Sequence, residues 1–347
     1  MPDSLLRGYV SDNAAGASPQ ILAAVVAAAE GLAAPYGQDP HSVALREQLA
    51  TVFEREVDVF PVGTGSAANG LALAALTPPW GSILAHPDGH IDNDEAGAPE
   101  FFTNGAKIVS VAGPNSKMWP DTLRTAVANR RGDVHSVQPS VVSITQVTES
   151  GSVHTLDELR EIADIAHDAG LRVHMDGARF ANALVALDAT PAQMTWQLGV
   201  DVLSFGATKN GTMTADAVVS FDPSLAAELG YRHKRAGQLT SKMRFQSAQL
   251  SAYLDDGLWL RNARQANAMA RRLALGLRSV PSVGLLGDAR ANILFCTFPA
   301  ALTAALHADG FDFYDGRWAP GVVRLVTSFA HSEADIDAFL EAARAHG

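Results

Sequence analysis

Two charged residues stand three positions apart in HMDGARFANA, which covers residues 174–183. Asp176 follows the apolar run LRVHM, and Arg179 follows a Gly-Ala pair. An ionised carboxylate at the end of a buried strand is costly unless a cation pairs with it. The segment therefore indicates a site that needs a carboxylate and a guanidinium. For Asp176, the alternative is a helix cap for the residues that follow.

A lysine ends another apolar stretch, in SFGATKNGT at residues 204–212. The amine of Lys209, poorly solvated at the end of a strand, suits Schiff-base formation with an aldehyde. The competing interpretation is a loop lysine whose ammonium group reaches solvent.

A glycine-rich turn, GTGSAAN at residues 63–69, lies between a predicted strand and a predicted helix. Amides at a helix N-terminus attract anions, and glycine allows close backbone approach. Gly65 and Ser66 are therefore candidate phosphate ligands. A plain strand-to-helix turn capped by Ser66 explains the same residues, and neither the Walker pattern nor the dinucleotide pattern is present.

Two further residues fall where a ligand would lie. His90 follows a predicted strand, and a helix cap or a surface histidine is the simpler interpretation for it. Arg324 interrupts the apolar strand VVRLVTS, where a buried guanidinium requires a carboxylate or a phosphate. A structural ion pair is the alternative for Arg324.

Apolar strands alternate with helices along most of the chain, which is typical of a mostly parallel sheet covered on both faces. Ligands of such sheets collect at the carboxyl ends of the strands. From about residue 240 the pattern changes to a long helical stretch and a short α/β segment. We therefore expect a large domain at residues 1–240 and a smaller one at 241–347. The expected strands are 82–87, 107–112, 140–147, 171–177, 200–209 and 216–222, and the expected helices include 19–33, 41–56, 93–105, 121–131 and 155–170.

Composition excludes several classes of protein. The 347 residues carry a formal net charge of −11, which argues against nucleic acid as the main partner. No apolar run reaches membrane-spanning length and no signal peptide is visible, so we expect no membrane association and a cytoplasmic location. The single cysteine, Cys296, has apolar neighbours and is expected in the core, not as a nucleophile.

The anion-binding turn, carboxylate, lysine, histidine and two arginines together match the requirements of pyridoxal 5'-phosphate. An aspartate suits its ring nitrogen, a lysine its aldehyde and a helix N-terminus its phosphate. No metal site is predicted.

The chain resembles the threonine aldolases of the beta-eliminating lyase group, which have the aspartate-aminotransferase fold. The similar motifs are SDNAAGASPQILAAV, PYGQDP, VGTGSAAN, GHIDNDEAGAP, MDGARFANALVAL, SFGATKNGT and VVRLVTS. The resemblance implies fold type I of the pyridoxal-phosphate enzymes, with a mostly parallel seven-stranded sheet and a smaller C-terminal α/β domain. It also implies a homo-oligomer, a dimer of dimers, with sites at subunit interfaces.

The resemblance also implies a role for each matching residue. Lys209 would form the Schiff base, Asp176 would hold the ring nitrogen, and His90 would stack on the ring. Gly65 and Ser66 would bind the phosphate. Ser11, Tyr36, Arg179 and Arg324 would bind the substrate. Lys242 and Arg244 lie in the segment that would lend phosphate contacts across a subunit interface.

One position departs from the family pattern. Thr148-Glu149-Ser150-Gly151 stands where many threonine aldolases have Thr-His-Asn-Gly. Glu149 thus replaces a histidine on the side of the substrate's β-hydroxyl group. Glu149, His90 and a held water molecule remain alternatives for the base, and a loop role remains open for Glu149.

The implied reaction is the retro-aldol cleavage of an L-configured β-hydroxy-α-amino acid to glycine and an aldehyde. Threonine, allo-threonine and phenylserine are alternative substrates. The alternatives are another fold type I enzyme, such as an aminotransferase or a different β-eliminating lyase, and a binding module without catalysis.

Overall fold

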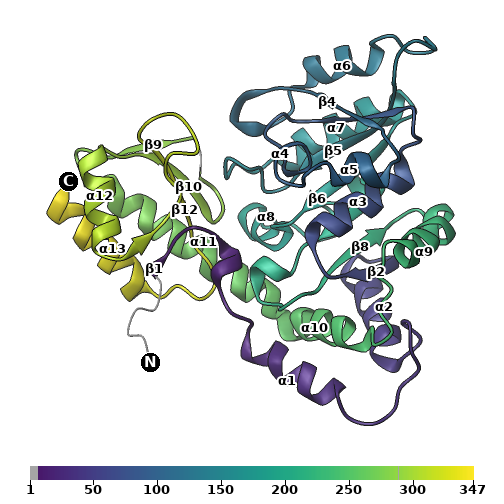
Figure 1. Cartoon of the computed structure of the whole chain (residues 1–347), viewed down its shortest axis with the longest axis horizontal. Coiled ribbons are helices and arrows are strands. Elements are labelled where there is room, and N and C mark those ends of the chain that lie inside the picture. The colour runs from purple at the N-terminus through teal and green to yellow at the C-terminus, as the bar shows by residue number, and fades with distance from the viewer. Residues whose placement is uncertain (1–6, 288) are drawn as a thin grey trace.

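A computed structural model describes residues 7–287 and 289–347. Two bodies of unequal size lie side by side, joined by the long helix α11 (Leu258–Leu277) (Figure 1). The first six residues, on which the expectation of no signal peptide partly rests, lie outside the described residues. No helix in the described part of the chain is long and apolar enough to cross a membrane.

A seven-stranded sheet forms the centre of the larger body. Its strand order places β8 antiparallel between β2 and β7, while β7, β6, β5, β3 and β4 run parallel to one another. The mostly parallel sheet predicted from the sequence is therefore confirmed. In spatial order the strands are β2 (Asp58–Val62), β8 (Asp216–Ser220), β7 (Val202–Phe205), β6 (Arg172–Gly177), β5 (Gln138–Thr145), β3 (Gly81–Ala85) and β4 (Lys107–Ser110).

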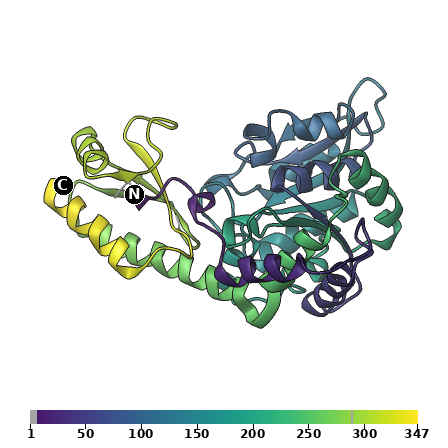
Figure 2. The same cartoon turned by 60° about the horizontal axis from the view of Figure 1, so that its bottom comes forward.

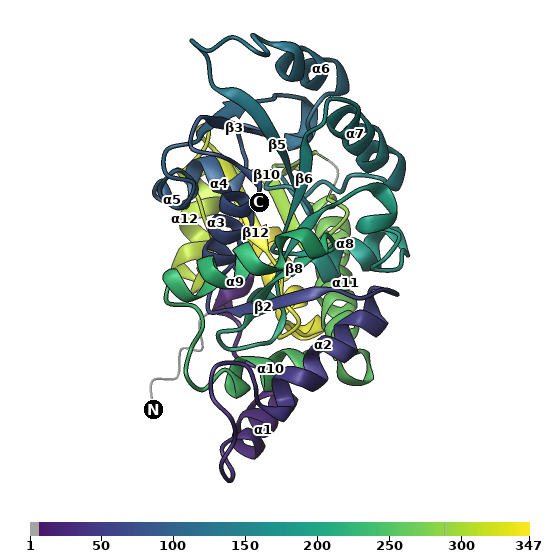
Figure 3. The same ribbon diagram turned by 90° about the vertical axis from the view of Figure 1, so that its right-hand side faces the viewer.

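Helices cover both faces of this sheet (Figure 3). The alternation of side chains along each strand sends Val173 and Met175 of β6 into the core under α7 (Leu156–Asp168) and α8 (Phe180–Leu187). His174 and Asp176 therefore point to the other face, which α3 (Gly65–Leu76) covers. The remaining helices of this body are α1 (Pro19–Ala28), α2 (Pro40–Val52), α4 (His90–Asn93), α5 (Ala98–Phe102), α6 (Pro120–Ala128), α9 (Ala226–Arg235) and α10 (Arg244–Leu254).

The smaller body is a second α/β layer (Figure 2). An antiparallel sheet of β9 (Gly284–Leu286), β10 (Ile293–Thr297) and β12 (Val322–Val326) packs on α11, α12 (Ala300–Ala308) and α13 (Glu333–His346). The N-terminal strand β1 (Arg7–Gly8) pairs with β11 (Phe311–Asp312), and Tyr9 lies in this core. The division at residues 240 and 241 stays a prediction.

Local backbone geometry accounts for most differences from the expected elements. Of the helix expected at 93–105, only α5 forms, because α4 ends at Asn93 and Ala96 and Gly97 adopt positive φ angles of 51° and 75°. The strand expected at 200–209 ends at Phe205, after which Gly206 starts the turn toward Lys209. Helices α9 and α12 were not among the expected elements.

Gly206 allows β7 to pass close to the end of β6. A Cβ at this position would lie 2.5 Å from the carbonyl oxygen of Ala178 and 2.6 Å from its Cα. We expect Gly206→Ala to destabilise the protein by about 1–3 kcal/mol through this overlap. In Gly230→Ala, the added Cβ meets nothing within 4 Å inside α9, so stability should be unchanged or higher. Thermal unfolding of both variants measures the difference, and equal melting temperatures would contradict the proposed crowding.

Candidate active site

Four neighbouring strands bring candidate residues to one edge of the sheet. Lys209 follows β7, Asp176 is the second-last residue of β6, Glu149 follows β5 and His90 follows β3. These strands are parallel, so their carboxyl ends meet at the same edge, where ligands of such sheets bind. The structure thus gathers residues that are up to 119 positions apart in sequence (90 to 209).

The turn that carries Lys209 is fixed by a buried carboxylate. Asp216 of β8 accepts hydrogen bonds from the amides of Ala207 and Thr208 at 2.7 and 3.0 Å, and from the Thr208 hydroxyl. Burial raises the pKa of Asp216, against these hydrogen bonds. On the far side of the turn, Asn210 donates to the hydroxyl of Tyr253 at 2.7 Å. Lys209 itself is half-buried on this rigid turn.

Asp176 is a buried carboxylate without an ion pair in the described part of the chain. One oxygen accepts from the amide of Ala178 at 3.0 Å and the other from Asn69 Nδ2 at 2.9 Å. The helix cap that was the alternative for Asp176 is absent, since Arg179 occupies the N-cap position of α8 and no side chain makes a capping bond there. Asp176 is 2% exposed, so its charge requires compensation from a group other than water.

His90 lies against a second buried carboxylate. Its Nδ1 is 2.8 Å from Oε1 of Glu95, whose side chain is fully buried. The same oxygen accepts from Asn69 Nδ2 at 2.8 Å. The hydrogen bond to Glu95 raises the pKa of His90, and burial opposes the rise. Asn69 therefore joins the carboxylates of Glu95 and Asp176.

Arg179 makes a bidentate ion pair with Asp12. Its Nε and Nη2 lie 2.7 and 2.9 Å from the two carboxylate oxygens, and both side chains are buried. Asn292, before β10, donates to the same carboxylate at 3.0 Å. Burial alone would raise the pKa of Asp12, but the charges of Arg179 and Lys209 outweigh burial and lower it.

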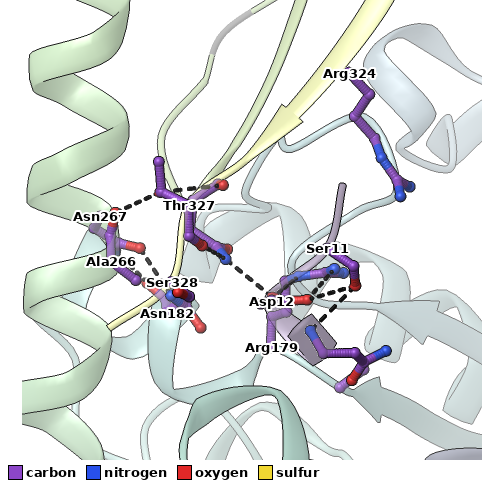
Figure 4. Close-up of polar contacts among 12 residues, drawn as sticks. Ser11, Asp12, Arg179, Asn182, Ala266, Asn267, Arg324, Thr327 and Ser328 are labelled. Carbon is purple, nitrogen blue, oxygen red and sulfur yellow. Dashed lines mark hydrogen bonds and ion pairs between the residues drawn. The ribbon is translucent and has the colours of Figure 1, made fainter. Parts of the chain in front are cut away.

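Arg324 approaches the same region from the smaller body (Figure 4). Its Nη2 donates to the carbonyl of Val10 at 3.2 Å, and its guanidinium lies over the rings of Tyr314 and Trp318. Its buried Nε has no hydrogen-bond partner in the described chain. Burial and the repulsion of Arg179 lower the pKa of Arg324. This guanidinium can still bind an anion.

A pocket of about 480 Å³ separates Arg324 from Glu149. One side comes from the smaller body, with the apolar surfaces of Leu286, Phe295 and Trp318. The other side comes from the sheet edge and includes the half-buried Glu149. No hydrogen bond or ion pair joins the Glu149 carboxylate to the described residues, so this group is free to contact a ligand.

The glycine-rich turn differs from the expected cap. Thr64, not Ser66, caps α3 by accepting from the amide of Ala67 at 3.1 Å. The amide of Gly63 donates to Gln238. A Cβ on Gly65 would meet nothing within 4 Å, so open space lies beside the first turn of the helix. The amides of Gly65 and Ser66 have no partner in the described chain and are available to an anion.

Some candidate residues lie elsewhere within one chain. Tyr36 lines a different pocket beside α2 and α9, with Lys234 over its ring at 4.4 Å. Lys242 is exposed, and Arg244 donates to the carbonyl of Gly31. Ser11 caps the short turn that holds Asp12, by accepting from the amide of Asn13. The roles predicted for these residues stay predictions.

Four residues of the site were not singled out from the sequence. Asp12, Asn69 and Glu95 occur inside the quoted motifs SDNAAGASPQILAAV, VGTGSAAN and GHIDNDEAGAP, within five positions of a residue that was selected. Asp216 lies in a strand that carried no other signal. For Asp12, Asn69 and Glu95, an acid or amide within a few positions of a selected residue is the signal that could have found them.

The sequence pattern of the Beta-eliminating lyase family matches residues 9–297. A low specificity L-threonine aldolase of Pseudomonas sp. (strain NCIMB 10558) is 40% identical over 328 residues, which are 94% of this chain and 94% of that protein. This chain belongs to the beta-eliminating lyase family. The recognition predicted from its motifs is confirmed.

Further relatives support the assignment of this chain to the beta-eliminating lyase family. A low specificity L-threonine aldolase of Pseudomonas aeruginosa is 42% identical over 306 residues, 88% of each chain. The structure of a threonine aldolase from Leishmania major matches with a TM-score of 0.91 at 29% identity, over 97% of this chain and 98% of that one. The predicted fold type I is confirmed. Mouse CSAD shares this fold, with a TM-score of 0.77 at 16% identity over 98% of this chain and 84% of that one.

The contribution of the buried Asp12–Arg179 ion pair to the free energy of unfolding can be tested. Asp12→Asn leaves Arg179 charged in a buried position, so we expect a loss of about 3 kcal/mol at neutral pH. Because the folded pKa of Asp12 lies below its ordinary value of 3.8, the contribution is complete above that pH and fades as the pH falls through the lowered pKa. Thermal unfolding of both proteins between pH 3 and 7 measures the difference.

Asp121→Asn serves as the control, because its partner Arg124 is solvent-exposed and their ion pair should add little. An Asp12→Asn protein as stable as the Asp121→Asn protein would show that the buried pair adds nothing.

Proposed function

We propose that this protein is a pyridoxal 5'-phosphate-dependent aldolase that cleaves L-threonine, L-allo-threonine or related β-hydroxy-α-amino acids to glycine and an aldehyde. The observation that carries the proposal is the arrangement of Lys209, Asp176, His90 and Glu149 on one sheet edge, where Glu149 and Arg324 line the same pocket. Two relatives at 40% and 42% identity are named low specificity L-threonine aldolases, which supports the substrate class.

The residues present fit this cofactor. Asp176 is buried without an ion pair among the described residues, and a protonated ring nitrogen would supply the missing positive charge. Gly65 and Ser66 offer free amides and open space for the phosphate. Lys209 would bind the aldehyde carbon, and its turn is held by Asp216. When bound, pyridoxal phosphate supplies an electron sink for the electrons of a broken Cα–Cβ bond.

The chain's own groups would then orient the substrate and move its protons. Arg324 has a free buried donor for the substrate carboxylate, while Arg179 is engaged with Asp12 and would contribute its remaining Nη1. Ser11, beside this ion pair, is the third candidate for the carboxylate. A base removes the β-hydroxyl proton as the Cα–Cβ bond breaks, and Cα receives a proton to give glycine.

Reaction products and substrate affinity test the proposal. Purified protein incubated with L-threonine should release acetaldehyde and glycine without a keto-acid co-substrate. An aminotransferase would require the keto acid and would not release these products. Arg324→Gln should raise KM by about tenfold or more, because a charge-assisted hydrogen bond to the carboxylate is lost. Arg264→Gln, on the exposed face of α11, should leave KM unchanged. A protein that releases neither product with any β-hydroxy amino acid would contradict the proposal.

The proposed assembly is a homotetramer in which a neighbouring copy supplies Tyr36, Lys242 and Arg244. Exposed apolar side chains on α1, Leu22 and Val26 at 46% and 68% exposure, support an interface near these residues. The buried Cys296 supports the predicted reducing, cytoplasmic location.

Light scattering should give four times the chain mass of 36.5 kDa. If sites are shared, mixing inactive Lys209→Ala chains with Arg244→Ala chains should restore activity, because a hybrid contains one intact site. A monomeric active enzyme would contradict the assembly.

A further inference from the structure

Two groups compete for the same task in the proposed reaction, the acceptance of the β-hydroxyl proton. His90 follows β3 and Glu149 follows β5, and these two strands are neighbours in the sheet, so both residues lie at the same sheet edge. The sequence leaves both open as the base. Their partners in the structure differ sharply, and this difference assigns the roles.

We propose that Glu95, tied to Asp176 through Asn69, holds His90 as an imidazolium, and that Glu149 is the group that accepts the β-hydroxyl proton. This inference rests on the proposed function. Glu95 is then a positioning residue, which acts through His90 and does not touch the substrate.

The carboxyl group of Glu95 is placed as a hydrogen-bond acceptor for His90, and its second oxygen, Oε2, is buried without a partner among the described residues. Its Oε1 lies 2.8 Å from both Asn69 Nδ2 and His90 Nδ1, and an oxygen that receives two donors acts as an acceptor only. The side chain is fully buried. His90 is its only cationic partner among the ion pairs of the described residues. Loss of the histidine proton would leave a buried carboxylate uncompensated, which is costly.

Asn69 extends the argument to Asp176. Its Nδ2 group has two hydrogens, and it donates one to each carboxylate, at 2.8 and 2.9 Å. A neutral amide thus separates two buried negative charges, and no described cation other than His90 pairs with either one. The imidazolium balances Glu95, so Asp176 remains available for a second cation.

The other charges around His90 act in the same direction overall. Asp176 on β6 and Glu149 after β5 favour the imidazolium, while Lys209 and burial oppose it. Three carboxylates, including Glu95, therefore face this ring against one ammonium group. An imidazolium has no free lone pair, so His90 cannot accept a further proton.

Glu149 has the opposite surroundings. It is half-buried, lines the pocket that Arg324 also lines, and has no hydrogen-bond partner among the described residues. Its carboxylate oxygens are therefore free to contact a hydroxyl group of a bound substrate. Of the two candidates, only Glu149 offers an uncommitted acceptor.

Chemical modification tests the state of His90 without turnover. Diethyl pyrocarbonate modifies a histidine only when its imidazole is neutral. Mass spectrometry of peptides then measures the modification of His90 and of the exposed His135 in the same sample of cofactor-loaded protein. We expect His90 to become reactive at a higher pH than His135. In Glu95→Gln this pH should fall by about one unit or more, because the paired charge is gone. Glu161→Gln, on the surface of α7, should leave it unchanged.

Steady-state kinetics test the second half of the proposal. Glu149→Gln should lower kcat with L-threonine by about 100-fold or more, the usual loss for a missing general base. His90→Phe keeps an aromatic ring and should lose less than about tenfold. The alkaline limb of the kcat/KM profile should move to lower pH in Glu95→Gln, and Glu95→Gln should have no such effect in the His90→Phe background.

Two results would overturn the inference. One is that His90 becomes reactive at the same pH in the wild type and in Glu95→Gln. The same conclusion holds if His90 never reacts in Glu95→Gln and the kcat/KM profile of that variant matches the wild type. The other is a Glu149→Gln enzyme that turns over normally while His90→Phe is inactive. Absence of aldolase activity in the wild type would contradict the proposed function, and the modification experiment would still decide the state of His90.

Discussion

The buried ion pair between Asp12 and Arg179 connects the parts of the chain that form the site. Asp12 belongs to the N-terminal segment, and Arg179 begins the helix that follows β6. Asn292, from the smaller body, donates to the same carboxylate. Three distant segments thus meet at one buried charge, which would be costly to leave unpaired. This contact therefore joins the N-terminal segment to both bodies.

The same N-terminal segment also extends into the smaller body. β1 pairs with β11, and the carbonyl of Tyr9 accepts from the amide of Val326 at the end of β12. Arg324 of β12 reaches back to the carbonyl of Val10. The segment therefore positions the arginine that projects into the pocket. Its contacts explain how a strand far along the chain lies opposite the carboxyl ends of the central sheet.

Rigid supports surround each candidate reactive group. Asp216 fixes the turn of Lys209 from the antiparallel strand β8, and Asn69 fixes two carboxylates from α3. Two groups without hydrogen-bond partners among the described residues, the Nε of Arg324 and the Glu149 carboxylate, belong to residues that line one pocket. Paired groups form the scaffold and unpaired groups are left for a ligand. This division is typical of a preorganised site.

Sequence by itself determined the residue types and their order. The alternation of strands and helices predicted the parallel sheet, and Lys209, Asp176 and His90 were selected because each ends or follows an apolar strand. Boundaries were less certain: positive φ angles at Ala96 and Gly97 broke a helix that the pattern predicted as continuous. The cap of α3 fell on Thr64, although Ser66 offers the same chemistry.

Only the tertiary structure decided which charges pair. Arg179 was expected to hold a substrate, yet two of its nitrogens bind Asp12, 167 positions away in sequence. Glu95 and Asn69 became partners of His90 and Asp176 for the same reason. Strand periodicity is a local property of the chain, whereas the neutralisation of a buried charge depends on segments that folding brings together.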